Sequence, residues 1–418
     1  RAGRAQGVRA VLPHDRDDHV ARLRLMAIEA VDPAARGLRS RRRTQSITAG
    51  GVVRRLDWPL LGALAALAAY GLWAINGITM HDPGGSAMQR QGLYAFAGAL
   101  LFAGAVFIDP AYYRRFHRPI YFGTLGLMLL VLAAGAATRG SKRWLDVGFF
   151  RFQPSEFGKV LFVLVLAAFL AERAKSISGP VAPLRAIGYG VVPILLVFVQ
   201  PDIGTALVYT VALAAVLLIA GVRWLHLGVL AALAVAGALA VLWLLPAAGV
   251  NVLKPYQSAR LTGFTHPDND PRGATYNLRQ SITAVGAGGL RGRGVLGATQ
   301  TRLNYLPEHS TDFAFASLAE EHGFFGASIL LLLYLLVVWR ALKVVAGARD
   351  LYCAIVAGGI AVMFLFQVFV NSAMAMGIAP ITGIPLPFVS VGGSSMLTNF
   401  LAIGILQAIH VRRNVRRR

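Results

Sequence analysis

The chain has 418 residues, of which 56% are hydrophobic and 14% are charged. Together with a mean hydropathy of +0.59, this excludes a soluble globular protein and predicts an all-α polytopic membrane protein. The net charge of +22 lies mainly in a basic N-terminal tail, a short C-terminal tail and the turns between apolar runs. That distribution favours membrane orientation and contact with anionic membrane lipids, and we expect no nucleic-acid partner.

The single cysteine, Cys353, leaves no disulfide within these residues, and no Cys/His cluster suggests a metal site.

In chain order, residues 1–55 mix charges of both signs without a long apolar run. We expect a basic, mostly disordered cytoplasmic extension there. Residues 56–411 are expected to form one transmembrane domain, and 412–418 a basic cytoplasmic tail. Apolar runs near the roughly 20 residues that cross a bilayer predict about ten spans: 58–78, 91–108, 119–137, 157–172, 186–200, 203–221, 225–246, 322–343, 352–376 and 394–411. The apolar stretch broken at Pro201 leaves nine or eleven open.

Lysine and arginine in short loops predict the orientation. The basic loops "YYRRFHRP", "ERAKS", "GVRW" and "WRALK" and the tail "RRNVRRR" alternate so that both termini are cytoplasmic, which requires an even number of spans. One large loop, 247–311, is then extracytoplasmic between the seventh and eighth spans. This loop and the "TRGSKRWLDVGFFRFQPSEFGK" loop are basic, which indicates either solvated charge or an outward-facing site for an anionic ligand.

Within the large loop, "YNLRQSITAVGAGGLRGRG" places Leu278, Ile282 and Val285 at helical spacing before a glycine cluster. We expect a short amphipathic helix at the outer surface, followed by a flexible turn whose amides could meet an oxyanion. The segment 377–397, "GIAPITGIPLPFVSVGGSSML", predicts a re-entrant loop lining a site, with a plain exposed connector as the alternative.

The stretch "LPEHSTDFAFASLAEEHGFFG" holds the candidate base, Asp312, where the eighth span begins. A partly desolvated carboxylate beside cations can be tuned for proton abstraction. The competing candidates are Glu308, His309 and Glu320. The alternative is helix capping, by Ser310 or by a Ser317–Glu320 capping box, and it accounts for Asp312 less well.

The "FRFQPSEFGKV" stretch places Glu156 and Lys159 three residues apart, on one face at the start of the fourth span. Ionisable groups inside a span usually face a cavity or one another, so an ion pair and a ligand contact are both open.

Six motifs in chain order, "GSKRWL", "FQPSEFGK", "QPDIGTA", "QSITAVGAGGLRGRG", "LPEHSTDFAFASLAEEHG" and "GIPLPFVSVGGSS", closely resemble the SEDS family of RodA, FtsW and SpoVE. The wording "TGIPLPFVS" is more similar to the RodA branch than to FtsW. The resemblance implies ten spans and a peptidoglycan glycosyltransferase that polymerises lipid II, an undecaprenyl-diphosphate-linked disaccharide pentapeptide, outside the cytoplasmic membrane. It also implies a class B penicillin-binding protein as the transpeptidase partner.

The resemblance assigns the essential acidic residue of the "TDF" motif to Asp312. We expect it to take the proton from the acceptor sugar's 4-hydroxyl, while cations bind the diphosphate leaving group. No cofactor is certain, although a divalent cation, Mg or Mn, could bridge the diphosphate and a carboxylate. The expected substrate-binding residues are Lys142, Arg143, Trp144, Glu156, Lys159, Arg260, Gln280, Ser281, Glu308, His309, Ser390, Gly392, Gly393 and Ser394.

Two positions depart from the family's pattern. Val391 stands where "SYGGSS" usually has Tyr, so any hydroxyl contact there is absent, and Ala314 replaces a common Ile with little bearing on the base. The rival functions are a lipid II flippase, an FtsW-like division polymerase, or a scaffold that activates the transpeptidase.

Overall fold

The structure is a computed structural model that describes residues 49–80, 87–138, 141–148, 150–177, 179–249 and 274–413. The chain divides into two units, 1–51 and 52–418, and the fold below is that of the second. Most of the predicted N-terminal extension therefore lies outside the described residues. A short helix, α3 (Ala49–Val53), occupies part of the remainder.

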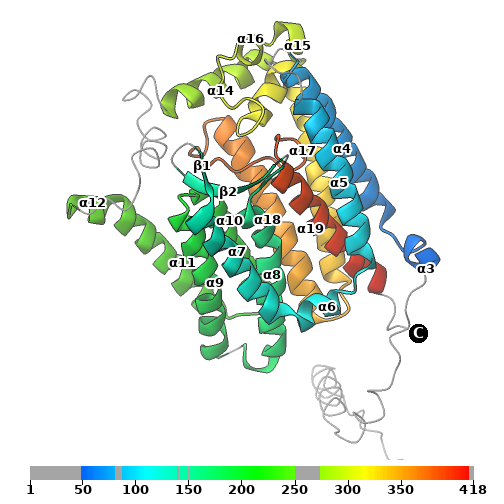
Figure 1. Ribbon diagram of the computed structural model, residues 1–418, viewed down its shortest axis with the longest axis vertical. Coiled ribbons are helices and arrows are strands. Elements are labelled where there is room, and N and C mark those ends of the chain that lie inside the picture. Colours follow the sequence, from blue (N-terminus) through cyan, green and yellow to red (C-terminus); the bar gives the residue numbers. More distant parts are fainter. Residues whose placement is uncertain are drawn as a thin grey trace, which may run out of the picture. The chain divides into compact units, whose positions relative to one another are not determined.

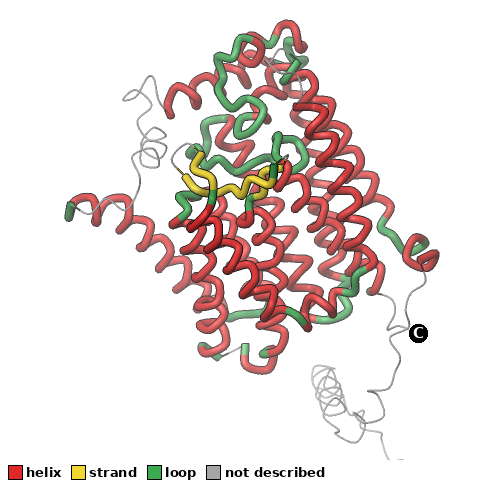
Figure 2. The backbone as a smooth tube through the Cα atoms, viewed as in Figure 1, coloured by secondary structure: helices red, strands yellow, loops and turns green. Residues whose placement is uncertain are grey.

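Ten apolar helices coincide with the ten predicted spans, and eight of them are long and apolar enough to cross a membrane. The long helices are α4 (Trp58–Ile78), α5 (Ala87–Phe107), α7 (His117–Ala134), α8 (Pro154–Glu172), α9 (Val181–Val199), α17 (Ala314–Ala346), α18 (Leu351–Ala375) and α19 (Gly393–Arg412). The shorter two are α10 (Ile203–Ile219) and α11 (Trp224–Leu239). The chain is thus a multi-pass α-helical membrane protein (Figures 1 and 2), while the count of ten crossings stays a prediction.

Side-chain caps set where several of these helices begin. Asp57, Asp202 and Asp350 precede α4, α10 and α18, and each carboxylate accepts a hydrogen bond from a first-turn amide. These bonds satisfy amides that have no partner inside the helix, which matters most where water is scarce.

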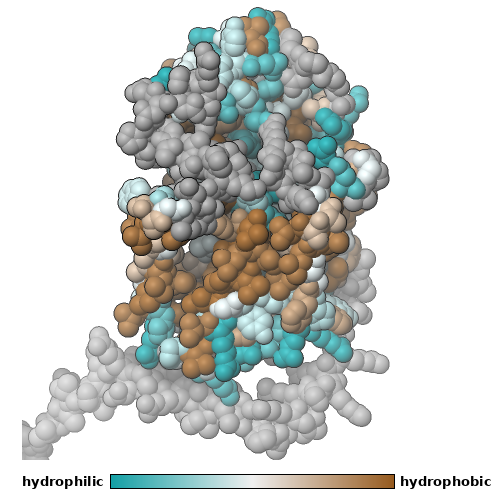
Figure 3. All heavy atoms as spheres, turned by 60° about the vertical axis from the view of Figure 1, so that its left-hand side comes forward, coloured by the Kyte–Doolittle hydropathy of each residue, from teal (hydrophilic) through white to brown (hydrophobic). Residues whose placement is uncertain are grey.

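Three helices form the interior of the bundle. Of an apolar stretch of 18 consecutive residues in each helix, 83% are buried in α8, 72% in α18 and 94% in α19. The corresponding shares are 17% in α7 and 22% in α5. The outer helices expose large apolar side chains such as Phe122, Leu195 and Leu233. Figure 3 shows a broad belt of hydrophobic residues around this face with hydrophilic residues below it, as expected for lipid contact.

The predicted eighth span, 322–343, corresponds to the part of α17 that follows an interruption at Gly323. Its φ of 66° is left-handed, and a Cβ there would lie 2.2 Å from the Gly292 amide nitrogen. The amides of Phe324 and Phe325 bond to the carbonyls of Gly289 and Leu290 instead of continuing the first helical segment. Glycine is therefore required, and it lets Ala314–His322 form a separate segment ahead of the span.

A small antiparallel sheet differs from the all-α expectation. Strands β1 (Ala136–Thr138), β2 (Ser141–Val147) and β3 (Phe150–Phe152) pair in the order β1-β2-β3 between α7 and α8. The sequence predicted only a basic loop here, because two of the three strands have only three residues each.

The large loop 247–311 also contains the predicted amphipathic helix, now α14 (Ala274–Gly288), followed by α15 (Gly294–Gly297) and α16 (Thr299–Arg302). Leu278 of α14 is buried and Val285 is partly buried against the core, whereas Ile282 is 44% exposed. The remaining short elements are α6 (Pro110–Arg115), η1 (Ala174–Ser176), η2 (Ala240–Leu244) and α12 (Leu245–Ala247).

Candidate functional site

The candidate base lies in a turn that is fixed by its own backbone. Glu308 has a φ of 55°, and its carbonyl accepts the amides of Thr311 and Phe313, each at 3.1 Å. The Thr311 hydroxyl donates to the Glu308 carboxylate at 2.7 Å. Left-handed backbone at a residue other than glycine is costly and tends to persist where function needs it. This turn presents Asp312 partly exposed, directly before α17.

The loop between α18 and α19 packs against this turn. Ser390 donates its hydroxyl to the Thr311 carbonyl at 2.5 Å and accepts the Leu386 amide at 2.9 Å. The amide of Val391 donates to the Ser310 carbonyl at 2.9 Å. This backbone bond does not depend on the side chain, so replacing the family's usual Tyr by Val391 leaves it intact.

Asn371 of α18 joins the same two segments from the other side. Its Nδ2 donates to the Asp312 carbonyl at 2.9 Å and to the Ile384 carbonyl at 2.8 Å, and the side chain is fully buried. Ile384 and Phe388 are 2% and 1% exposed. The predicted re-entrant loop is therefore buried between Ile384 and Ser390, and the exposed-connector alternative is wrong there.

The capping alternative for the opening of α17 is wrong. The residue at the N-cap is Phe313, which makes no side-chain cap. Ser317 lies inside the helix and donates its hydroxyl back to the His309 carbonyl at 3.1 Å, so it is not the N-cap of an S-x-x-E box.

Glu320, one of the competing bases, has a structural role. It is fully buried, and its carboxylate accepts the amides of Gln300 and Thr301, both at 2.9 Å, and the Thr301 hydroxyl at 2.8 Å. These bonds attach α16 to α17.

His309 is 9% exposed and its ring lies 3.2 Å from the Leu306 carbonyl. The carboxylates of the stretch that remain partly exposed are Glu308 and Asp312.

Glu156 and Lys159 form the ion pair that was one of the two alternatives. The ammonium lies 2.8 Å from Glu156 and 2.7 Å from the Gln367 amide oxygen of α18, and the two side chains are 4% and 1% exposed. Lys159 is thus closed to solvent in the centre of the bundle, and its direct contact with a ligand stays a prediction.

Arg143 lies on β2 of the small sheet, whose paired strands are called the hairpin below, and its side chain is bonded to the start of α10. Its guanidinium donates to the carbonyls of Gln200 and Pro201 and lies 3.7 Å from the Asp202 carboxylate. Asp202 also accepts a hydrogen bond from the side-chain amide of Gln153 at 3.0 Å. The "QPD" motif therefore positions the β2 cation, whose side chain is 22% exposed. Trp144 follows on β2, partly buried and opposite Ala136.

The start of α19 contacts the same hairpin. The Ser394 hydroxyl accepts a hydrogen bond from the backbone amide of Gln153 at 2.9 Å and donates one to the Arg151 carbonyl at 3.1 Å. Gly392 donates its amide to Gln91 of α5 at 3.2 Å. A Cβ on Gly393 would lie 2.6 Å from the Phe150 ring and 3.1 Å from the Tyr94 ring, so a larger residue there would displace these side chains.

The structure thus brings together the Asp312 turn, the Ser390–Ser394 segment and the Arg143 hairpin in one chain of hydrogen bonds. On α14, Ser281 is fully buried and donates to the Ala375 carbonyl at 2.8 Å, while Gln280 is partly buried. Arg260 and the side chain of Lys142 lie outside the described part of the chain.

Four buried polar side chains in or beside this network were not predicted from the sequence: Gln91, Gln153, Gln367 and Asn371. For Gln91, Gln367 and Asn371 a usable signal was present, because a buried amide inside an apolar span is costly and is normally kept for a partner. Gln153 precedes its span, and this signal does not apply to it. Among the described residues, no group of three His, Cys, Asp or Glu side chains could hold a metal ion.

The fold and the site define a polytopic membrane protein with a partly exposed carboxylate at one end of the bundle. The chain belongs to the FtsW/RodA/SpoVE family of cell cycle proteins, whose family model matches residues 54–415. It is 37% identical over 366 residues to the peptidoglycan glycosyltransferase MrdB of Escherichia coli K12, covering 86% of this chain and 95% of that one. It is 32% identical over 430 residues to the peptidoglycan glycosyltransferase RodA of Treponema pallidum, covering 86% and 98%.

Solved structures agree. A chain of a peptidoglycan synthase complex, solved to describe the coordination of polymerization and crosslinking, has a TM-score of 0.70 and 29% identity, covering 86% of this chain and 99% of that one. The rod-shape-determining protein RodA of Thermus thermophilus has a TM-score of 0.60 and 26% identity, covering 86% and 97%. This chain is therefore a multi-pass protein of the bacterial inner membrane.

Proposed function

We infer that the chain is a RodA-like peptidoglycan glycosyltransferase that polymerises lipid II at the outer face of the cytoplasmic membrane during cell elongation. Membership of the family and similarity to named glycosyltransferases over 86% of the chain carry this conclusion. An FtsW-like role in division and a flippase are not favoured by these relatives.

Asp312 is the proposed general base. The acceptor's 4-hydroxyl attacks the donor's anomeric carbon, the bond from that carbon to the diphosphate breaks, and the hydroxyl proton passes to the Asp312 carboxylate. Attack opposite the α-linked diphosphate inverts the centre and gives a β-linked glycan. The partly exposed position of Asp312, in a turn held by Glu308, Ser390 and Asn371, supports this role because a base must be positioned before it can act.

The departing diphosphate needs positive charge, and Lys142, Arg143 and Arg260 are the proposed ligands. Arg143 is held in place by Gln200 and Asp202, which leaves a partly exposed guanidinium of fixed orientation. A divalent cation, if it takes part, would find one carboxylate ligand at Asp312 or Glu308 and take the others from the diphosphate and water.

The proposed partner is a class B penicillin-binding protein that crosslinks the new strands. The structural relative from a peptidoglycan synthase complex supports such a partnership.

The test is to give purified protein lipid II in detergent, with the transpeptidase partner present. Detergent leaves no two compartments, so a flippase or a scaffold yields no product, whereas a polymerase yields glycan chains that a gel resolves. An absence of polymer from a folded preparation would reject the enzyme and leave the flippase or the scaffold. Repeating the assay with EDTA tests the divalent cation.

A further inference from the structure

A pocket lies far from Asp312, between α7, α8 and α9. Its volume is about 360 Å³. Its charged side, called the mouth below, is lined by His117 and Arg118 at the start of α7, by Glu172 at the end of α8 and by Arg173 directly after it. The opposite end of α7 leads into the β-hairpin of the candidate site. At 1.5 Å per residue, the 18 residues of α7 place the two about 27 Å apart.

The mouth of this pocket favours an anion. Arg118 has no ion-pair partner among the described residues. The Glu172 carboxylate lies 3.7 Å from the Arg173 guanidinium and 3.8 Å from the His117 ring, so both groups share it. Two guanidinium groups therefore face one carboxylate. The start of α7 also lies at the mouth, and with it the positive end of the helix dipole. No side chain caps the first amides of α7, so they add to the attraction for an anion.

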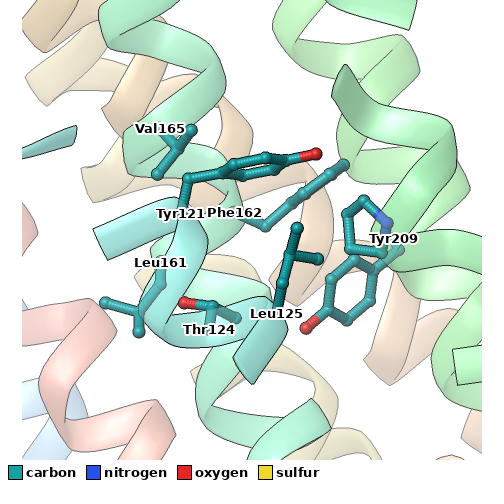
Figure 4. A pocket seen from close by; sticks show the side chains of 8 residues that line it. Tyr121, Thr124, Leu125, Leu161, Phe162, Val165 and Tyr209 are labelled. Atoms are coloured by element: carbon teal, nitrogen blue, oxygen red, sulfur yellow. The ribbon is translucent and has the colours of Figure 1, made fainter. Parts of the chain in front are cut away.

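The wall of the pocket favours an apolar chain. Phe122 and Tyr189 line it and are 66% and 42% exposed, and Phe169 lies under Arg173 with 3.8 Å between the guanidinium carbon and the ring centre. Tyr121 and Val165 continue from this pocket into an apolar crevice shown in Figure 4. That crevice has a volume of only about 10 Å³, so a long chain would lie outside it, along the lipid-exposed surface of α7 and α9.

Charge at the end of an apolar, lipid-exposed wall is the arrangement that suits an amphipathic anion. We propose that this pocket binds the phosphodiester headgroup of an anionic phospholipid, in the leaflet opposite the Asp312 site, with its acyl chains against α7 and α9. The orientation predicted from the basic loops makes this the cytoplasmic leaflet. The proposal does not depend on the chemistry at Asp312.

The test compares phosphatidylglycerol and phosphatidylcholine of identical acyl chains, titrated onto the purified protein and counted by native mass spectrometry. Arg118→Gln should weaken phosphatidylglycerol binding roughly fivefold, the effect of one cation near an anionic lipid, and leave phosphatidylcholine binding unchanged. Glu172→Gln should strengthen phosphatidylglycerol binding, because it removes the one carboxylate at the mouth. Arg223→Gln is the matched control, since Arg223 is exposed just before α11 and does not line the pocket.

Equal weakening by Arg118→Gln and Arg223→Gln would overturn the proposal, since it would show attraction to net charge alone. Unchanged binding in Arg118→Gln would do the same. Displacement of the lipid by millimolar glycerol 1-phosphate would show that the site takes a soluble phosphate compound instead. Arg118 is the primary probe because it is exposed, whereas Arg173 also bonds the Phe169 carbonyl and its loss could disturb α8.

Discussion

Lys159 carries its charge in the interior of the bundle, where an ammonium is stable only with partners. Glu156 and Gln367 supply them at 2.8 and 2.7 Å. Lys159→Met should therefore destabilise the protein by about 3–5 kcal/mol, because the Glu156 carboxylate is left buried and unpaired. The double variant Glu156→Gln/Lys159→Met should recover most of that loss. Thermal unfolding in detergent measures both.

The double variant also separates structure from ligand binding at this pair. If Lys159 only stabilises α8 against α18, polymerisation by the double variant should recover along with its stability. A double variant that unfolds like the parent protein and yet makes no polymer would show that the pair contacts substrate.

At the residue scale, ionisable groups beside apolar runs marked Asp312, Glu308, His309 and Glu320 as candidate bases, and the family resemblance selected Asp312. The residue pattern alone could not separate Asp312 from Glu320, since that distinction depends on Glu320 meeting the amides of Gln300 and Thr301 after folding. For Glu156 and Lys159 the pattern left an ion pair and a ligand contact open. Asn371 was missed for the same reason, because its bond to the Asp312 carbonyl joins residues 59 positions apart.

At the element scale, α4 and the loop before α19 touch backbone to backbone at Gly71. A Cβ there would lie 2.3 Å from the Phe388 carbonyl oxygen, and Phe388 itself has a left-handed φ of 65°. Gly71→Ala should force the loop away from α4, cost about 1–3 kcal/mol of stability, and slow polymerisation, because the same loop bonds the Asp312 turn through Ser390.

Gly62→Ala on the same helix is the control for this prediction. A Cβ at Gly62 would have no neighbouring atom within 4 Å, so alanine should be neutral or stabilise α4 by up to about 1 kcal/mol. Thermal unfolding and the polymerisation rate of both variants test the contact. Equal behaviour of the two variants would show that the loop position does not depend on Gly71.

The elements themselves were predictable in proportion to their length. Each predicted apolar run falls on a helix, because a bilayer demands long apolar segments whose backbone groups are paired internally. The three-stranded sheet was not predicted, since two of its strands have only three residues and the seven-residue β2 is rich in charged side chains. The interruption of α17 at Gly323 was also missed, because it depends on the packing of Leu290–Gly292.

At the scale of the whole molecule, the predicted orientation places both termini in the cytoplasm and α14–α16 outside. The native Cys353 is fully buried, so single cysteines can report the sidedness of the protein. Leu303→Cys should react with a membrane-impermeant maleimide on spheroplasts, and Arg115→Cys only after permeabilisation. Both positions are exposed at opposite ends of the bundle, and the unaltered chain is the control. The reverse labelling pattern would invert the topology.

The most direct test of the central claim is the initial rate of glycan formation from lipid II by purified Asp312→Asn protein with its transpeptidase partner. Asparagine keeps the size and the backbone bonds of the turn but cannot accept the proton, so we expect the rate to fall by about 10²–10⁴-fold. The matched control is Asp146→Asn, which removes a half-exposed carboxylate on β2 whose ion-pair partner among the described residues is Arg151. The control should keep the parental rate, and both variants should unfold at the parental temperature. Polymerisation by Asp312→Asn at the parental rate would contradict the account.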